Sequence, residues 1–144
     1  MPSDKLFQFV ILTPVKLVFS GRVRSVIFPA EKGFMGVMCY HAPFVGLVKP
    51  GPVLARVWEN EEERKRIFFV SQGLAKVASN TLTLLVDSAE AEDQIDEARA
   101  RSALERALKR LASRDPGVDR ERAERAKLRA LARLQIAQKK VFTD

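Results

Sequence analysis

The chain has very little of the side-chain chemistry on which most enzymes depend. Among its 144 residues there is one histidine, His41, and one cysteine, Cys39. A single histidine leaves too little material for a His-based metal site or a Ser-His-Asp triad. Cys39 and His41 would share a face of a strand, but a lone cysteine in an apolar strand usually belongs to a core. We therefore expect no catalytic residue and no metal site.

Several other signals are also missing. No G-x-x-x-x-G-K-[ST] sequence is present, so a P-loop is not expected. No run of about 18 apolar residues occurs, which excludes a typical membrane-spanning helix. The first residues lack the apolar region of a secretory signal, and one cysteine cannot form an internal disulfide. These absences predict a cytosolic location, including the cytosolic face of a membrane.

Charge of one sign is in excess. Lysine and arginine number 25 against 18 acidic residues, which gives a net charge of +7 and a pI of about 9.9. A basic chain of this kind suggests an acidic partner: nucleic acid, an anionic membrane or an acidic protein surface. A solvated basic face without a partner is the alternative. Because 47% of residues are hydrophobic, the chain can still bury a core.

The chain up to about Val86 consists of short apolar runs separated by turn residues. The runs expected to form strands are Leu6–Leu12, Lys16–Phe19, Val23–Phe28, Met35–Cys39, Val53–Trp58, Arg66–Val70, Leu74–Val77 and Thr81–Val86. Their spacing of about 8–12 residues predicts an antiparallel sandwich or barrel. The charged run Glu59–Arg66 predicts a solvated hairpin tip. Gly33 and Gly36 bracket an apolar loop in which a turn with positive φ is expected.

After Val86 the pattern becomes helical. Asp93 is the expected N-cap of a first helix, and residues 113–117 form a strong stop. Asp119 is expected to cap a second helix that runs to about Val141. The apolar positions expected to pack are Ile95, Ala98, Leu104, Ala107, Leu108 and Leu111 on the first helix and Ala123, Ala126, Ala130, Leu134, Ala137 and Val141 on the second. Two helices joined by a short turn predict an antiparallel hairpin.

The predicted seam of the hairpin consists mostly of alanine. At about 25 cal/mol per Å² of buried apolar surface, such a seam stabilises less than a leucine-rich one. One interpretation is therefore a hairpin that docks weakly and moves. A hairpin packed rigidly on the sandwich is the alternative, and composition does not separate the two.

Arginines form a stripe along the second predicted helix. Arg122, Arg125, Arg129 and Arg133 share one face, while Arg99 and Arg106 share a face of the first helix. If these sets converge, their like charges repel, so they need an anion between them or carboxylates beside them. Ordinary solvated arginines are the alternative, with Glu97, Glu105, Glu121 and Glu124 as local partners.

An ordered series of short motifs resembles one protein family over essentially the whole chain. The motifs are Leu12-Thr13-Pro14, Val26 to Pro29, Gly33-x-x-Gly36, His41-Ala42-Pro43, Lys49-Pro50-Gly51, Ser71-Gln72-Gly73 and the run Asn80 to Val86. Each motif is weak alone, but their order and spacing together are specific. On these motifs the chain resembles the epsilon subunit of bacterial F-type ATP synthases.

The resemblance implies a ten-stranded antiparallel β-sandwich at residues 1–88, followed by a two-helix hairpin at residues 89–144. It further implies a non-catalytic subunit of the rotating central stalk, bound to the gamma subunit, to the ring of c subunits and to the alpha and beta subunits of the catalytic head. The implied location is the cytoplasmic side of the bacterial inner (plasma) membrane, peripheral and without contact to nucleic acid. In this family the hairpin can inhibit ATP hydrolysis.

The same resemblance assigns roles to residues at two places. The loop that meets the c ring would contain Phe34, Met35 and His41, with apolar residues where relatives often have an acidic one. The run Ile95 to Ala100 resembles the [IL]-D-x-x-R-A motif of epsilon subunits that bind ATP as a regulatory ligand. The implied ATP-binding residues are Glu90, Ile95, Asp96, Arg99, Ala100, Arg106, Arg129 and Arg133.

Together these features predict a two-state switch. With ATP bound, the hairpin would lie folded against the sandwich. Without ATP, the second helix would extend along gamma and present Arg122, Arg125, Arg129 and Arg133 to acidic residues of the beta subunit. Two rivals remain: a stalk subunit that does not sense nucleotide, and a nucleic-acid-binding barrel with a basic arm. The sandwich half lacks the aromatic residues interleaved with basic ones that base stacking requires, which weighs against the second rival.

Overall fold

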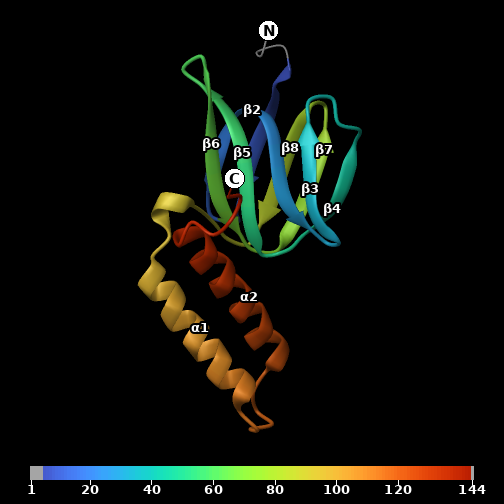
Figure 1. Cartoon of the computed structure of the whole chain (residues 1–144). Helices are drawn as coiled ribbons and strands as arrows, with labels where there is room; N and C mark the ends of the chain where they lie inside the picture. Colours follow the sequence, from blue (N-terminus) through green and yellow to red (C-terminus); the bar gives the residue numbers. More distant parts are fainter. Residues whose placement is uncertain (1–4, 144) are drawn as a thin grey trace.

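The structure, a computed structural model, describes residues 5–143 and contains a β-sandwich followed by two helices (Figure 1). The predicted fold class is thus confirmed. The strands are β1 (Phe7–Leu12), β2 (Leu17–Ala30), β3 (Gly33–Met38), β4 (Phe44–Val48), β5 (Gly51–Glu59), β6 (Glu62–Val70), β7 (Gly73–Ala78), β8 (Thr81–Val86) and β9 (Ala89–Ala91). Within the described residues there are nine strands, so the expectation of ten was one too many.

The strand predictions differ from the structure at β2, β4 and β9. Two separate strands were expected across Ser20-Gly21, but the backbone stays extended there and Gly21 pairs with Phe9 of β1. A Cβ at Gly21 would lie 2.9 Å from the Phe19 ring, so this glycine makes room for an aromatic side chain and is not a turn. Sequence reasoning missed β4 and β9. The strand expected at Met35–Cys39 is confirmed as β3, but it begins at Gly33, so Gly36 lies in a strand and only Gly33 has the positive φ expected of a turn there.

Strand β2 joins the two layers of the sandwich. Its first half pairs with β1, which continues through β8 and β7 to β4. Its second half pairs with β5 and β3, and β5 continues through β6 to β9. Because one 14-residue strand serves both layers, the sheet closes on itself except at short edges.

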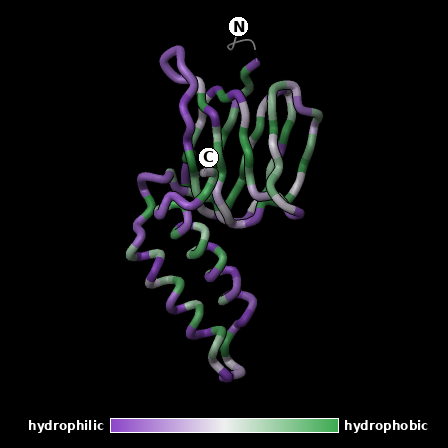
Figure 2. The backbone as a smooth tube through the Cα atoms, in the orientation of Figure 1, coloured by the Kyte–Doolittle hydropathy of each residue, from purple (hydrophilic) through white to green (hydrophobic). Residues whose placement is uncertain are grey.

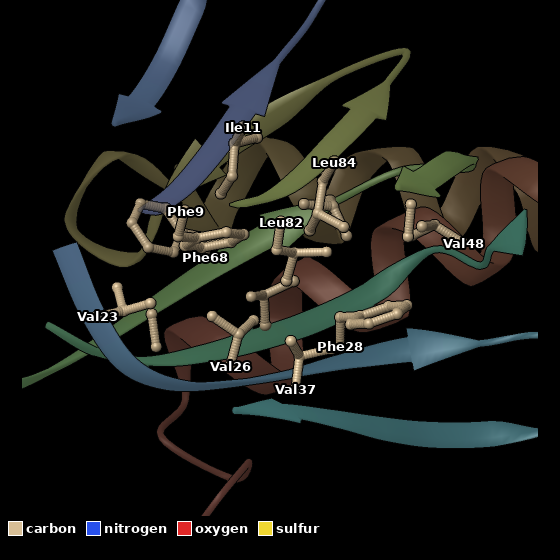
Figure 3. Packing of buried hydrophobic residues seen from close by; sticks show 14 of the residues in the cluster. Phe9, Ile11, Val23, Val26, Phe28, Val37, Val48, Phe68, Leu82 and Leu84 are labelled. Atoms are coloured by element: carbon tan, nitrogen blue, oxygen red, sulfur yellow. The ribbon is translucent and has the colours of Figure 1, made fainter. Parts of the chain in front are cut away.

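The core between the layers is built from large apolar side chains. Phe9, Phe28, Phe68, Leu82 and Leu84 are all fully buried, or nearly so, and point into one core from β1, β2, β6 and β8 (Figure 3). The alternation along each strand follows the period of two expected for a sheet with one buried face. In β6, for example, Phe68 points into this core and the next residue points out.

The hairpin consists of α1 (Glu97–Ala112) and α2 (Arg120–Ala137), and a short 3-10 turn, η2 (Glu92–Gln94), precedes it. Asp119 caps α2 as predicted, by accepting a hydrogen bond from the Arg122 backbone N–H at 3.0 Å. The prediction for α1 was wrong by one turn: Asp93 lies in η2, and Asp96 is the cap. The second helix also ends earlier than predicted, since Lys139 adopts a positive φ of 59°.

The seam between the helices is made of alanine. Ala100, Ala107, Ala123 and Ala130 are almost fully buried where α1 meets α2. Ala107 is buried as predicted, whereas Ala98 and Leu108, also expected in the seam, are exposed, and Ala100 is buried in the first turn instead. The opposite faces of the hairpin are hydrophilic, as is the tip between β5 and β6 (Figure 2).

Only the end of α2 packs firmly on the sandwich. Ala132 and Ile136 lie against Phe69, which points outward from β6, and these three form a second small core. Ile67, Ile95 and Val141 pack around it. Strands β5 and β6 carry the contacts of α2 with the sheet, whereas α1 contacts mainly α2. The hairpin is therefore attached to the sandwich mainly through the C-terminal end of α2 (Figure 1).

Candidate functional site

A cleft opens where the sandwich meets the hairpin. Its volume is about 480 Å³, within the range of sites for small molecules. The lining residues come from the segment after β8, from η2 and from both helices. They are Ser88, Glu90, Gln94, Asp96, Arg99, Ala100, Ala103, Arg106 and Arg133.

The run from Ile95 to Ala100 is held in place by local structure. Asp96 caps α1, its carboxylate accepting a hydrogen bond from the Arg99 backbone N–H at 3.0 Å. Ile95 packs on the small core below α2, and Ala100 is buried in the helix seam. The capping bond therefore fixes the first turn of α1, from which the Arg99 side chain reaches the cleft.

Glu90 and Arg133 form an ion pair at the floor of the cleft. The Arg133 Nε donates to Glu90 Oε1 at 2.5 Å, and both side chains are about a quarter to a third exposed. Glu90 is placed by the pairing of β9 with β6, where it lies opposite Phe69. The guanidinium of Arg133 also lies over the Phe69 ring, 4.1 Å from its centroid. A charged pair and an aromatic face together fix this arginine.

Arg99 and Arg106 line the cleft from α1, whereas Arg133 lines it from α2. Both are exposed side chains on α1, and neither forms an ion pair among residues 5–143. Glu97, expected as a local partner of the stripe, pairs instead with Arg101 at 3.1 Å. Two cations without a carboxylate partner among the described residues therefore line a cleft whose third arginine is paired with Glu90. Such a wall suits an anion with several oxygens.

Arg129 does not line the cleft, although it lies only one turn before Arg133. It is half-buried, with the carboxylate of Asp87 near enough to act on its charge. Burial lowers the pKa of its guanidinium, and the charges of Arg133 and Arg125 lower it further, while Asp87 raises it. The structure thus gathers Glu90, Asp96, Arg99, Ala100, Arg106 and Arg133 of the predicted set around the cleft. Ile95 and Arg129 lie outside its lining.

Sequence reasoning missed Ser88, Gln94 and Ala103 in the cleft. A signal for Ala103 was present, because it lies four residues after Arg99 and three before Arg106 on the same helix face. Nothing in the sequence marked Ser88 or Gln94, since Ser88 reaches the cleft from the turn after β8 and Gln94 from η2, which follows β9.

The remaining arginines of the stripe, Arg122 and Arg125, are exposed on α2. Arg122 borders a second cleft of about 330 Å³ at the hairpin tip, together with Arg110. These two arginines face solvent on a part of the hairpin that extends away from the sandwich (Figure 1). They are available to an acidic surface without movement of the sandwich.

The three residues expected at a ring contact do not share one surface. Phe34 is 59% exposed on the outer face of β3. Met35, one position later on the strand, turns inward and packs on the main core. His41 lies beyond the end of β3, with its ring edge toward Phe44. Of the three, Phe34 is the one that presents a large apolar side chain to solvent.

A row of leucines crosses the outer face of the other layer. Leu17, Leu12, Leu85, Leu74 and Leu47 lie directly opposite one another on β2, β1, β8, β7 and β4. Four of them are 44–55% exposed, and Leu12 is half-buried. A contiguous exposed apolar row of this kind is a feature expected of an interaction surface. Sequence reasoning missed this row.

Two family models together match most of the chain. One, described as "ATP synthase, Delta/Epsilon chain, beta-sandwich domain", matches residues 6–92, and the other, described as "ATP synthase, Delta/Epsilon chain, long alpha-helix domain", matches residues 93–138. The chain belongs to the ATP synthase delta/epsilon family. The resemblance noted from the motifs is thereby confirmed.

Curated relatives point to the epsilon branch of this family. The chain is 41% identical to the ATP synthase epsilon chain of Moorella thermoacetica over 127 residues, which cover 88% of this chain and 92% of that one. It is 38% identical to the ATP synthase epsilon chain of Nitratidesulfovibrio vulgaris, over 92% of this chain and 96% of that one. Both alignments include the sandwich and the hairpin.

A solved structure shows the same fold at lower identity. A chain in the cryo-EM structure of the Euglena gracilis mitochondrial ATP synthase, comprising OSCP, F1 and the c-ring, superposes with a TM-score of 0.75. It is 22% identical and covers 88% of this chain and 78% of its own length. Within residues 5–143, no helix is long and apolar enough to cross a membrane, and no cluster of His, Cys, Asp and Glu could hold a metal ion.

Proposed function

We propose that this family member is a non-catalytic subunit of the rotating central stalk, whose hairpin restrains ATP hydrolysis and is held down by bound ATP. The observation that carries the proposal is the basic cleft at the junction of sandwich and hairpin. A ligand there touches both parts at once, so its binding depends on their relative position. The proposed location is peripheral, on the cytoplasmic side of the bacterial plasma membrane.

The sandwich supplies two surfaces for coupling. The leucine row offers an apolar face on β1, β8, β7 and β4, which suits a permanent interface with the gamma subunit. Phe34 is a separate exposed apolar residue, on β3. We expect it to contact apolar atoms of the c-ring loops rather than their polar groups. The alpha and beta subunits would be reached only by the hairpin.

ATP suits the cleft for reasons of charge and size. The exposed Arg99 and Arg106 lack ion-pair partners among the described residues and can grip phosphate oxygens. Arg133 is held by Glu90 and Phe69, so its guanidinium lies at a fixed place on the wall that belongs to α2, with N–H groups besides Nε–H that can donate to a ligand. Ligand oxygens between α1 and α2 would then link both helices to the sandwich.

The switch follows from linkage. ATP that binds only the docked hairpin stabilises it by RT ln(1 + [ATP]/Kd), which is about 2.7 kcal/mol when ATP is 100-fold above Kd. When ATP falls, the second helix would leave the sheet, extend along gamma and offer Arg122, Arg125, Arg129 and Arg133 to acidic residues of the beta subunit. Hydrolysis would then be inhibited when nucleotide is scarce.

Calorimetric titration of the isolated chain with ATP tests the ligand. We expect binding that weakens by at least 10-fold in Arg106→Ala. Arg110→Ala is the matched control, because Arg110 lies one turn later on α1 and outside the cleft. No heat of binding at millimolar ATP would reject the sensor and leave a stalk subunit that does not respond to nucleotide.

Removal of the hairpin tests the restraint. A chain ending after Ala91 keeps β9 and hence the sandwich. We expect the assembled enzyme with this chain to hydrolyse ATP faster than the enzyme with the full chain. Equal rates would reject inhibition by the hairpin.

The ring contact has its own test. Phe34→Ser should weaken the coupling of ATP hydrolysis to proton pumping, measured as protons moved per ATP in vesicles. Met38→Ser is the control, since Met38 is on the same strand, points the same way and is 63% exposed. Equal loss in both variants would mean that the surface as a whole, and not Phe34, is involved.

A further inference from the structure

The chain after α2 folds back over the sandwich. Helix α2 ends at Ala137, and the segment Lys139–Thr143 then crosses the outer face of the sheet near β5 (Figure 1). Two of its residues adopt positive φ values, 59° at Lys139 and 49° at Phe142. Residues other than glycine adopt this left-handed region only at an energetic cost, so the surrounding contacts must hold the segment.

Four contacts hold this segment, and they reach three separate elements. The Lys139 ammonium pairs with Glu92 of η2 at 3.2 Å. Val141 packs on the small core of Phe69 and Ile136. The Lys65 Nζ of β6 donates a hydrogen bond to the backbone carbonyl of Phe142 at 2.8 Å.

The fourth contact is aromatic. The Phe142 ring meets the Phe34 ring of β3 edge-on, with 5.6 Å between the ring centroids. This edge-to-face arrangement is the favoured one for two aromatic rings. Phe34 is the exposed residue assigned above to the ring contact, so the end of the chain partly covers that surface.

We propose that residues 139–143 form a latch, which locks the hairpin onto the sandwich and, in the same state, covers the part of the Phe34 ring that Phe142 contacts. The latch is continuous with α2, so the helix cannot leave the sheet unless these four contacts break. Undocking of the hairpin and full exposure of Phe34, which is 59% exposed in the docked state, are then one event. By linkage, a partner that binds Phe34 favours the undocked hairpin, and a docked hairpin weakens that partner's contact to the same degree.

The latch deepens the proposed switch, and only its effect on the ring rests on that proposed function. The latch itself is a property of the isolated chain without nucleotide. Its failure is therefore distinguishable from a failure of ATP sensing, which the titration above measures.

Hydrogen exchange of the full-length chain without nucleotide tests the ionic contact. Lys139→Glu should open α2 about two- to five-fold more often, the range expected for an exposed ion pair, seen as faster exchange from Ala132 to Ile136. The swap Glu92→Lys with Lys139→Glu should restore the slower rate. Lys140→Glu is the matched control, with the same change of charge one residue later. Equal effects of Lys139→Glu and Lys140→Glu, without rescue by the swap, would overturn this contact.

A double-mutant cycle tests the masking of Phe34. Phe34→Ala and Phe142→Ala should each increase opening, and the double variant should increase it about two- to ten-fold less than the product of the two, as for a directly contacting aromatic pair. Exchange at Phe9 and Leu82 in the main core reports whether each variant is folded. Effects that multiply fully in a folded double variant would overturn the latch.

Discussion

The sandwich and the hairpin are held together by different kinds of core. The sandwich buries phenylalanine, leucine, isoleucine and valine between two hydrogen-bonded layers, with Phe9, Phe28 and Phe68 at less than 2% exposure. The helix seam buries alanines, and one small core around Ile136 ties α2 to the sheet. Since apolar burial stabilises in proportion to area, we expect the hairpin to detach at a lower cost in free energy than the sandwich needs to unfold.

The largest effect is expected in the sandwich. Phe68→Ala removes a fully buried ring from the main core and should lower the free energy of unfolding by about 3–5 kcal/mol. Denaturant unfolding followed by far-UV circular dichroism measures this loss. A loss below about 1 kcal/mol would mean that the sandwich is not the stable body described above.

The second effect should be large but confined to the hairpin. Ile136→Ala removes the buried anchor of α2 and should cost about 2–5 kcal/mol of docking free energy. Because the main core is untouched, we expect fast exchange in both helices and unchanged protection in the strands. Leu128→Ala, at a half-exposed position of α2, is the control and should leave both unchanged. Loss of strand protection in Ile136→Ala would remove the distinction between the two regions.

The alanine seam should tolerate larger residues poorly. Ala107→Leu adds three carbons where α1 meets α2 at 1% exposure, which should force the helices apart at a cost of about 1–3 kcal/mol. Ala98→Leu is the control, because Ala98 is exposed on the same helix. The thermal midpoint of helix unfolding measures the difference. Equal thermal midpoints for Ala107→Leu and Ala98→Leu would mean that the seam is loose enough to accept leucine at residue 107.

The smallest effects are expected at the helix caps. Asp96→Ala and Asp119→Ala should each cost about 1 kcal/mol of helix stability, since each removes one capping hydrogen bond. Only Asp96 lines the cleft, so only Asp96→Ala should also weaken ATP binding in the titration. Asp96→Asn should restore the cap. Equal losses of ATP affinity in both alanine variants would mean that the affinity depends on the stability of the helices and not on the Asp96 side chain in the cleft.

The architecture could be predicted from the sequence because its signals are local. Short apolar runs, a change of period near Val86 and the cap at Asp119 are each contained within a few residues. The cap of α1 shows the limit: Asp93 and Asp96 are equally good caps, and the choice depends on β9 and η2, which position the chain before the helix. Gly21 shows it too, because the Phe19 ring, and not a turn, explains that glycine.

The site depended on long-range placement and was predicted only in part. The residues that the family resemblance implied include Glu90, Arg99 and Arg106, which do line the cleft, but Arg129 lies one turn before Arg133 on the same helix face and does not reach it. The leucine row needs the parallel pairing of β1 with β8, which no local pattern reveals. The proposed division at residues 88 and 89 stays a prediction.

Hydrogen exchange of the unmodified chain, with and without millimolar ATP, tests most directly whether a detachable hairpin is held by ligand on a rigid body. We expect the amides of α1 and α2 to exchange through local opening, at least 10-fold faster than those of β1, β5 and β8. ATP should slow the hairpin amides and leave the strand amides unchanged. The account would be contradicted if hairpin and strand amides exchanged at one common rate, or if ATP left the exchange rate of the hairpin amides unchanged.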